Sequence, residues 1–435
     1  MTDFTLGVNY WPRRKAMYWW SNFGEGEVSD EFAVIRDIGL KVVRLFLLWD
    51  DFQPEPDSVS HAAVDNLVKV ADAAEKYGLG LDITFFTGHM SGPNWSPRWL
   101  VGGDLPPAAH QQWLREVVSA GQRTDRGYRN MFHDEVAIGA EKLLLKTVVG
   151  TLKDHPAVWL WNLGNEPDLF AWPNTSGEGA AWVRDMVGLI KSIDPNHPVT
   201  IGLHGDGLHR DNGLRIDKVF TETDIAVMHS YPMYTPWSRK PLDPDFVPFT
   251  CALTAALAGK PVLMEEFGGC TALPGEKTYN MKWTETNGRE REQFMASEED
   301  LAEFLSLTLP KLHDSGATGA MVWCFADYAY ELWDRPPCQN QWHERFFGLV
   351  RPDGSLKPHA KVFQDFAKTR PQVKPIPEYA KLTVNPDEFY SEPLPHLVRL
   401  YKQYVEGVEA YEGTRATAPM PDNLEIKNTN ETADH

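Results

Sequence analysis

The sequence predicts an α/β protein built as a (β/α)8 barrel, the TIM-barrel architecture, with long loops at the C-terminal face and a short C-terminal extension. Three observations lead to this prediction. Eight short apolar runs alternate with segments of helical periodicity. The runs are almost continuously apolar, as in a parallel sheet that is covered on both faces. No phosphate-binding glycine loop follows the first run, which disfavours the alternative of an open, doubly wound sheet.

The eight expected strands are short and rich in aliphatic, aromatic and β-branched residues, which suit a pleated, buried surface. Each is separated from the next by enough chain for the crossover connection that parallel neighbours require. The expected strands cover residues 4–10, 42–49, 79–86, 157–166, 198–203, 225–231, 261–267 and 319–326.

The helices between these strands are marked by capping residues and glycines. Ser29 and Ser297 are expected N-caps, and Gly39 and Gly78 are expected to end two of the helices. The expected helices cover residues 30–39, 62–78, 141–155, 179–194, 297–316 and 359–370, with weaker segments near 214–224 and 247–259.

The chain is predicted to divide into a barrel domain, residues 1–370, and a C-terminal extension, residues 371–435. The extension begins with a proline-rich stretch and then carries one segment, 397–411, that predicts a single helix. Its polar end, 417–435, is expected to be mobile.

Three connections are long for a compact barrel. They span residues 87–137, 268–296 and 327–357, and each follows the C-terminal end of an expected strand. Barrel active sites form from the loops on that face, and long loops there are usually functional. We therefore expect the functional site at this end of the barrel.

The chain carries a formal net charge of -19. This excess of acid argues against nucleic acid and anionic membrane surfaces as partners, because both repel it. No stretch approaches the roughly 18 apolar residues of a membrane span. The start, MTDFTLGVNYWPRRK, lacks the basic and long apolar regions of a secretion signal, which favours a cytoplasmic location.

The 16 tryptophans and 12% aromatic residues leave two interpretations open, a large aromatic interior or a ligand that stacks on rings, as sugars do. The four cysteines show no CxxC spacing and are expected to be free thiols. No HExxH or Walker A pattern is present and no GxGxxG pattern follows a strand, so neither a metal ion nor a cofactor is expected.

Residues 157–170 read AVWLWNLGNEPDLF, an apolar strand that ends in an amide and a carboxylate, Asn165 and Glu166. The seventh expected strand, PVLMEEFGG, also ends in acid, at Glu265 and Glu266. Strands four and seven face each other across an eight-membered ring, so the two acidic ends meet at the mouth of the barrel. Two carboxylates on opposite walls of one pocket are what glycosidic cleavage requires, one as acid and one as nucleophile or base.

Only one residue of the Glu265–Glu266 pair is expected to point into the barrel mouth, because neighbours in a strand point to opposite faces. The other is expected to face the helix layer. Alternation alone does not select between them.

The motifs NEP after the fourth strand and EFG after the seventh resemble glycoside hydrolase family 5, in which the catalytic glutamates follow these two strands. The resemblance spans roughly residues 4–370, and its motifs appear in the right strand order. The further matches are Arg44 in VVRLF, His229 and Tyr231 in VMHSY, Trp323 in VWCF and the segment FGLVRPDGSLKP at 347–358.

The resemblance implies that Glu266 is the nucleophile and Glu166 the acid/base of a retaining glycosidase. Arg44 would help to keep Glu266 ionised, and Tyr231 would hydrogen-bond the nucleophile. Asn165 would hold the sugar 2-hydroxyl, a contact that strengthens in the transition state.

His229 would position the sugar or the acid/base, and Trp323 would stack under the sugar ring. The loop after the third strand, FFTGHMSGPNWSP, offers a sugar further polar and aromatic groups at His89, Asn94 and Trp95. The stretch NYWP at 9–12 is a similar candidate, and weaker candidates are the stretch HGDG at 204–207 and the pair Asp327–Tyr328.

Bulky tryptophans in the long loops favour a closed pocket, which binds a chain end, over an open groove. GVNYWPRRKAMYWW, WDDFQP and FFTGHMSG are similar to a subgroup of family 5 that includes cytosolic exo-β-mannosidases. This resemblance implies removal of terminal β-mannose from β-1,4-linked manno-oligosaccharides or mannosyl-N-acetylglucosamine. The expected partner is thus an oligosaccharide substrate, and homo-oligomer formation stays open.

Three alternatives stay open at this point. One is an endo-acting β-1,4-mannanase or β-glucanase. Another is a carbohydrate-binding protein on an inactive barrel, against which the paired glutamates argue. The last is a metal-dependent barrel hydrolase that uses His89, His204 or His229 with Asp206, residues that lack the tight spacing of metal ligands.

Overall fold

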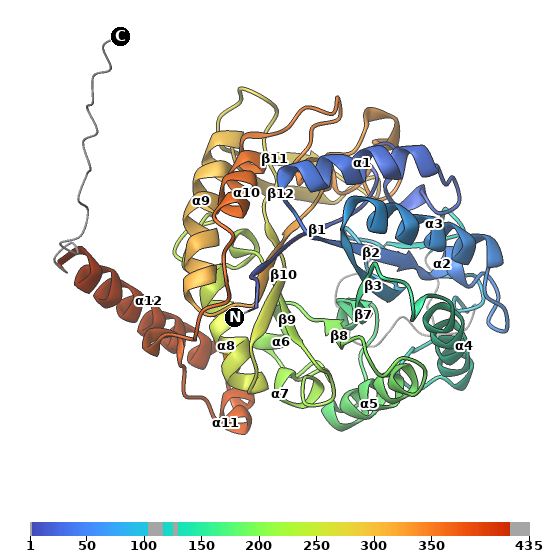
Figure 1. The fold of residues 1–435 in the computed structure, drawn as a ribbon, viewed down its shortest axis with the longest axis horizontal. Helices are drawn as coiled ribbons and strands as arrows, with labels where there is room; N and C mark the ends of the chain where they lie inside the picture. Colours follow the sequence, from blue (N-terminus) through green and yellow to red (C-terminus); the bar gives the residue numbers. More distant parts are fainter. Residues whose placement is uncertain (1, 103–115, 125–128, 418–435) are drawn as a thin grey trace, which may run out of the picture.

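The computed structural model describes residues 2–102, 116–124 and 129–417. Its centre is a sheet of eight parallel strands in the order β8-β7-β3-β2-β1-β13-β10-β9, surrounded by helices (Figure 1). A parallel bridge between His204 and His229 brings the two end strands, β8 and β9, together and nearly closes the sheet. The predicted (β/α)8 barrel is therefore confirmed.

All eight barrel strands lie within or overlap the apolar runs that predict them. Their side chains are buried almost throughout; all seven residues of β2, for example, are buried. This is the burial expected where side chains on one face fill the barrel and those on the other meet the helices. The strands are β1 Thr5–Asn9, β2 Val42–Leu48, β3 Gly80–Thr87, β7 Val158–Asn165, β8 Val199–Gly202, β9 Ala226–Ser230, β10 Val262–Gly268 and β13 Gly319–Trp323.

A helical segment follows each strand before the chain returns to the sheet. The segment after β8 is reduced to two single turns, α6 and α7, whereas the others run for several turns. The helices of the outer layer are α1 Glu25–Ile38, α2 Trp49–Phe52, α3 His61–Tyr77, α4 Glu135–Leu152, α5 Ser176–Ile193, α6 Asp206–His209, α7 Ile216–Val219, α8 Phe246–Ala258, α9 Glu298–Asp314 and α10 Pro358–Lys368.

Helix starts are predicted less well than strands. Ser297 caps α9 as predicted, since its side chain accepts a hydrogen bond from Asp300 N at 3.0 Å. Ser29 is not an N-cap but lies inside α1, which starts at Glu25 after Gly24. That start places acidic residues in the first turn, where the helix dipole favours them. α4 also starts earlier than predicted, after the N-cap Asp134.

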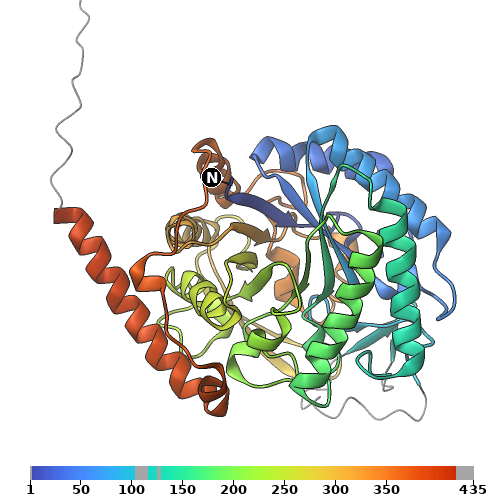
Figure 2. The same cartoon turned by 60° about the horizontal axis from the view of Figure 1, so that its bottom comes forward.

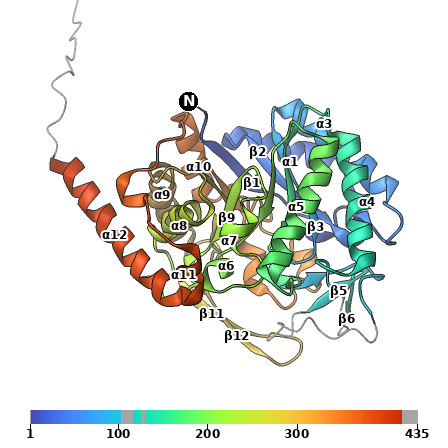
Figure 3. The same cartoon turned by 90° about the horizontal axis from the view of Figure 1, so that it is seen from below.

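The long loops build small structures of their own at one end of the barrel (Figure 3). The loop after β3 contains strands β4 Asn94–Trp95, β5 Val117–Ser119 and β6 Gln122–Thr124, which form a three-stranded sheet. The loop after β10 is a hairpin of β11 Tyr279–Thr284 and β12 Glu290–Met295.

The C-terminal extension contains two helices where one was expected, α11 Pro386–Ser391 and α12 Pro393–Thr417. Both lie along the outside of the barrel (Figure 2). Tyr390 Oη donates to Gly207 O at 2.9 Å, and the Tyr401 ring packs on Phe249 with centroids 4.9 Å apart. The division of the chain near residue 370 stays a prediction, and the tail predicted to be mobile lies almost wholly outside the described residues.

Among the described residues, no helix combines the length and the apolar character needed to cross a lipid bilayer.

Candidate active site

The amide that ends β7 fixes the central cation of the site. Asn165 Oδ1 accepts a hydrogen bond from Arg44 Nη2 at 3.0 Å, and its Nδ2 donates to His89 O at 3.1 Å. Asn165 thus ties β7 both to β2 and to the loop after β3. This explains why the apolar strand ends in an amide.

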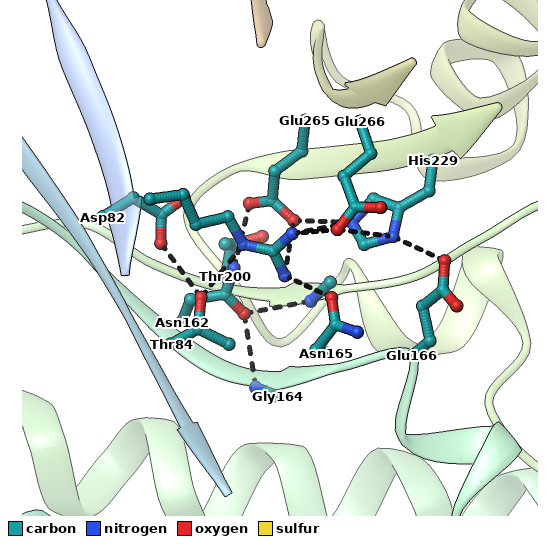
Figure 4. Close-up of polar contacts among 12 residues, drawn as sticks. Asp82, Thr84, Asn162, Gly164, Asn165, Glu166, Thr200, His229, Glu265 and Glu266 are labelled. Atoms are coloured by element: carbon teal, nitrogen blue, oxygen red, sulfur yellow. Dashed lines mark hydrogen bonds and ion pairs between the residues drawn. The ribbon is translucent and has the colours of Figure 1, made fainter. Parts of the chain in front are cut away.

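Glu166, the next residue, takes a left-handed backbone conformation with φ 47 and ψ 53. Such a conformation is uncommon for a residue with a side chain and costs free energy, so other contacts must maintain it. Glu166 N donates to Gly202 O at 2.9 Å. The turn directs the carboxylate toward His229, whose Nδ1 lies 2.8 Å from Glu166 Oε1 (Figure 4).

The acidic end of β10 differs from the expectation that one glutamate faces the helices. Glu265 and Glu266 both turn toward His229 (Figure 4). The physical reason is a bulge: pairing with β9 shifts between Met264 and Glu266, so that Glu265 is an extra residue on this strand. A bulge breaks the alternation of side chains, and such bulges are frequent next to active sites.

Arg44, at the centre of β2, is fully buried and connects five strands. Its guanidinium is close to both glutamates of β10, with Nη1 2.5 Å from Glu266 Oε1 and Nη2 3.4 Å from Glu265 Oε2. Arg44 also donates to Asn9 Oδ1 at 3.1 Å, Thr84 Oγ1 at 3.0 Å and Asn165 Oδ1 at 3.0 Å, and its Nη1 lies 3.4 Å from His229 Nε2.

Gly202, the last residue of β8, makes room for this cluster. A Cβ at this position would stand 2.6 Å from Arg44 Nη2 and 3.0 Å from Glu265 Oε2. Both distances are too short for any side chain to be accommodated without displacing the ion pair.

Glu166 and Glu266 face each other across a short gap. One carboxylate oxygen of each lies within 4.8 Å of the other, and His229 lies within the same distance of both. Tyr231 Oη donates to Glu266 Oε2 at 3.0 Å. Glu266 therefore accepts hydrogen bonds from Arg44 and Tyr231, which both favour its ionised form.

The surroundings shift the pKa values of these carboxyl groups in different directions. Burial raises the pKa of Glu266, against the lowering effects of His229 and Arg44. Burial also acts on Glu166, but His204 and His229 outweigh it and hold the pKa of that carboxyl well below its usual range. Glu166 is therefore ionised in this structure.

These residues lie at the bottom of a cavity of about 470 Å³, within the size range of small-ligand pockets. Of the ten principal site residues predicted from the sequence, seven line this cavity. Arg44 does not line it but contacts Glu266 and Asn165, which do. The seven are His89, Asn165, Glu166, His229, Tyr231, Glu266 and Trp323.

Asn94 and Trp95 do not line the cavity but support the loop that does. Asn94 Oδ1 lies 2.9 Å from His89 Nδ1, and Trp95 Nε1 donates to Met90 O at 3.1 Å. Both side chains are buried. The contact of Asn94 and Trp95 with a substrate stays a prediction.

Some of the weaker candidates line the cavity and others do not. His204 and Asp206 of the HGDG stretch line the cavity. Asp327 instead forms a buried ion pair with Lys357 Nζ at 2.8 Å under the loop after β13. His204 Nε2 lies 2.7 Å from Asp168 Oδ2.

Hydrogen bonds join the three long loops to one another near the cavity. Arg123, in β6, donates to Thr286 Oγ1 in the β11–β12 hairpin at 2.9 Å and to Gln339 Oε1 in the loop after β13 at 2.6 Å. Trp283 Nε1 of the hairpin donates to Asn340 O at 2.7 Å. Loops from three strand ends thus form one wall.

Gly92 brings this wall against the cavity. It has φ 103, and a Cβ on it would stand 2.6 Å from Gln341 Cγ. Beside it, Ser91, Gln341 and Glu344 line the cavity, although the sequence did not single them out. Only the length of their loops indicated a functional role, because bends and a 3-10 helix as short as Trp342–Phe346 show no periodicity from which side-chain directions can be predicted.

A family model described as cellulase, glycosyl hydrolase family 5, matches residues 7–299. The chain belongs to glycosyl hydrolase family 5. This confirms the family-level resemblance stated from the strand-end motifs.

Among the curated members of the family, a protein of Aspergillus flavus named probable mannan endo-1,4-beta-mannosidase F is 25% identical over 303 residues, covering 62% of this chain and 59% of that protein. The chain spans 59% of the length of this protein, and 32% of the length of another curated relative, the putative mannan endo-1,4-beta-mannosidase 9 of Oryza sativa subsp. japonica.

Two solved structures share the fold. A variant of the GH5_18 protein from Streptomyces cattleya, solved with Manβ1-4GlcNAc, has TM-score 0.68 at 20% identity, covering 86% of this chain and 83% of that one. The exo-beta-1,4-mannosidase Op5Man5 from Opitutaceae bacterium strain TAV5 has TM-score 0.67 at 24% identity, covering 85% and 60%.

Replacing Arg44 with Met should lower the free energy of unfolding by about 3–5 kcal/mol, because Glu265 and Glu266 would stay buried without their cation. Arg44 and His229 outweigh burial and lower the pKa of Glu265. A carboxyl with a depressed folded-state pKa stabilises the fold above its ordinary pKa and loses this contribution as pH falls. The difference in the free energy of unfolding between the two proteins should therefore become smaller toward acid pH. Urea unfolding at several pH values would measure it.

Lys361→Met is the matched control, since Lys361 pairs with Asp365 at 2.7 Å on an exposed helix face. Its effect should stay below about 1 kcal/mol. Equal losses in both variants would show that the buried cluster is not the stabilising element we describe.

Proposed function

We propose that this family 5 chain is a retaining exo-β-mannosidase that removes terminal β-mannose from β-1,4-linked manno-oligosaccharides or mannosyl-N-acetylglucosamine. The approach of Glu166 and Glu266 to within 4.8 Å carries the proposal. Retaining glycosidases need their two carboxyl groups about 5–5.5 Å apart, whereas inverting enzymes need about 6.5–9.5 Å to admit a water molecule.

In the first step, a Glu266 carboxylate oxygen attacks the anomeric carbon while the glycosidic C–O bond breaks. Glu166 gives a proton to the leaving oxygen, so that the leaving sugar departs as a neutral alcohol. Glu266 is suited to this attack because Arg44 and Tyr231 hold its two oxygens in place.

In the second step, water attacks the anomeric carbon of the glycosyl ester and gives its proton to Glu166. The C–O bond to Glu266 breaks, and mannose leaves with its anomeric configuration retained. Trp323 lies in the cavity lining as a face on which a sugar ring stacks.

The interlocked loops support exo action. Ser91, Gly92, Gln341 and Glu344 line the cavity where the loops after β3 and β13 meet. The leaving group must extend from the sugar on the side of Glu166, whose neighbours His204 and Asp206 line the cavity at the end of β8. A wall on the other side admits one terminal sugar and blocks a continuing polymer.

The choice of mannose rests on the relatives. The curated relatives that match are named for β-1,4-mannan cleavage, and one similar structure was solved with Manβ1-4GlcNAc. The names of these curated relatives, which are endo-mannosidases, favour the endo-acting alternative. A soluble oligosaccharide is the partner under either proposal.

We extend the proposal to a cytoplasmic location. All four cysteines are free and buried, which is the usual state in reducing compartments.

An oligomannoside labelled at its reducing end discriminates exo from endo cleavage. The protein should release mannose one unit at a time, so the labelled products shorten in single steps, and mannan should keep its viscosity while mannose accumulates. Glu266→Gln should lower the turnover rate to below about 10⁻³ of the original, because the attacking carboxylate oxygen is lost. Early release of internal fragments would support the endo alternative instead.

Glu166→Ala should slow hydrolysis of a p-nitrophenyl β-mannoside by about 10²–10⁴-fold, the contribution of general acid–base catalysis. Glycosylation by a 2,4-dinitrophenyl β-mannoside should suffer much less, since this leaving group needs no proton. Steady-state and pre-steady-state rates for both substrates provide the comparison, with the exposed Glu276→Ala as control. Equal losses for both substrates would remove Glu166 from the role of acid.

A further inference from the structure

The ring of His229 lies between three carboxylates. Its Nδ1 is 2.8 Å from Glu166 Oε1 and 3.5 Å from Glu266 Oε1, and its Nε2 is 2.9 Å from Glu265 Oε2. The His229 side chain is 0% exposed, so its partners are protein groups. Besides the carboxylates, Arg44 Nη1 lies 3.4 Å from Nε2, farther away than Glu265 Oε2. Figure 4 shows Glu166 and Glu265 on different sides of this ring.

An ionised carboxylate only accepts hydrogen bonds, whereas a neutral imidazole has one N–H and one bare nitrogen. With a carboxylate oxygen at each ring nitrogen, both nitrogens must carry hydrogen for both contacts to form. With Glu166 and Glu265 ionised, the geometry therefore fits an imidazolium at His229.

Glu265 is held firmly in its position on the far side of the ring. Asn162 Nδ2 donates to Glu265 Oε1 at 2.9 Å, and Arg44 Nη2 lies 3.4 Å from Glu265 Oε2. The Glu265 side chain is 0% exposed, so no sugar touches it. The catalytic steps described above leave this carboxylate without a role.

We propose that His229 stores the proton that Glu166 delivers to the leaving group, and that Glu265 is the positioning residue that keeps this proton on the ring. This inference rests on the proposed function of Glu166 as the acid. The Nδ1 proton moves to Glu166 Oε1 along their hydrogen bond, which leaves a neutral His229 whose Nε2–H still donates to Glu265. Glu166 passes that proton to the leaving oxygen.

The return of the proton balances the cycle. Water loses a proton to Glu166 when it attacks the glycosyl ester, and Glu166 returns this proton to His229 Nδ1. One proton enters from water and one leaves with the departing sugar, so each turnover restores the imidazolium.

The charges around His229 agree with this assignment. Burial lowers the pKa of His229, but Glu266, Glu166 and Glu265 outweigh it and, against Arg44, raise the pKa to about 9. These four groups, from β7, β10 and β2, are the charged side chains that face the ring.

Glu265→Gln tests the positioning role, and Asp82→Asn is the matched control. Asp82 is fully buried on β3 beside Glu265 but does not touch His229, and burial together with Glu265 raises its pKa well above the usual range. A glutamine amide can donate to Nε2, which leaves the ring only the Nδ1 hydrogen. Asp82→Asn should leave the ring doubly protonated.

The first measurement needs no substrate. Nitrogen NMR of the His229 ring should show two N–H groups up to about pH 9 in the unchanged protein and in Asp82→Asn. In Glu265→Gln, a neutral ring should already dominate near pH 7. A neutral ring at pH 7 in the unchanged protein overturns the proposal, whether or not the protein hydrolyses mannosides and whether or not Glu265→Gln folds.

The second measurement is the pH profile of kcat/KM for p-nitrophenyl and 2,4-dinitrophenyl β-mannosides. In Glu265→Gln the alkaline limb of the profile for the first substrate should move down by one to two pH units. At pH 8 this shift corresponds to a roughly 10–100-fold loss of kcat/KM, which is part of the usual contribution of acid–base catalysis. For the second substrate, kcat/KM should change less than threefold. Equal losses for both substrates, with unchanged profiles, would reduce Glu265 to a structural role and overturn the proposal.

Discussion

Arg44 is the fixed positive charge on which the C-terminal end of the barrel is organised. It is fully buried, and a buried guanidinium needs acceptors for its donors and negative charge nearby. Asn9, Thr84 and Asn165 supply acceptors from β1, β3 and β7, and the two glutamates of β10 supply the charge. Because these partners come from different strands, the ion cluster and the closure of the barrel depend on each other.

The bulge in β10 gives this single cation two carboxylates with different surroundings. Glu266 faces the cavity and accepts from Tyr231, whereas Glu265 faces the interior and accepts from Asn162. A regular strand would have directed one of them into the helix layer. The same bulge therefore supplies the group that we propose to attack the sugar and the group that contacts His229.

The sequence predicts the barrel well because its strands are defined by local hydrophobic pattern. Continuous burial on both faces requires continuous apolar runs, and all eight were found where the strands lie. Helix starts depend on a choice among nearby capping residues, which tertiary packing decides; α1 therefore begins before Ser29, and α4 begins after Asp134.

The candidate site is predictable at the strand ends and less so in the loops. Glu166, Glu266 and Arg44 converge because barrel geometry fixes where strand ends lie. The position of Glu265 depends on a bulge that alternation does not reveal. Gln341 caps, and Glu344 lies within, a short 3-10 helix, Trp342–Phe346, in the loop after β13. The contact of both residues with the cavity depends on long-range bonds such as that between Arg123 and Gln339.

The most direct test of the account is to trap the glycosyl ester. The protein would be incubated with 2-deoxy-2-fluoro-β-mannosyl fluoride, digested, and its peptides analysed by mass spectrometry. The account predicts one fluoromannosyl group per chain, attached to Glu266. A label on Glu265 or elsewhere, or turnover of mannosides without any trapped ester, would contradict the assignment of Glu266 as the nucleophile held by Arg44.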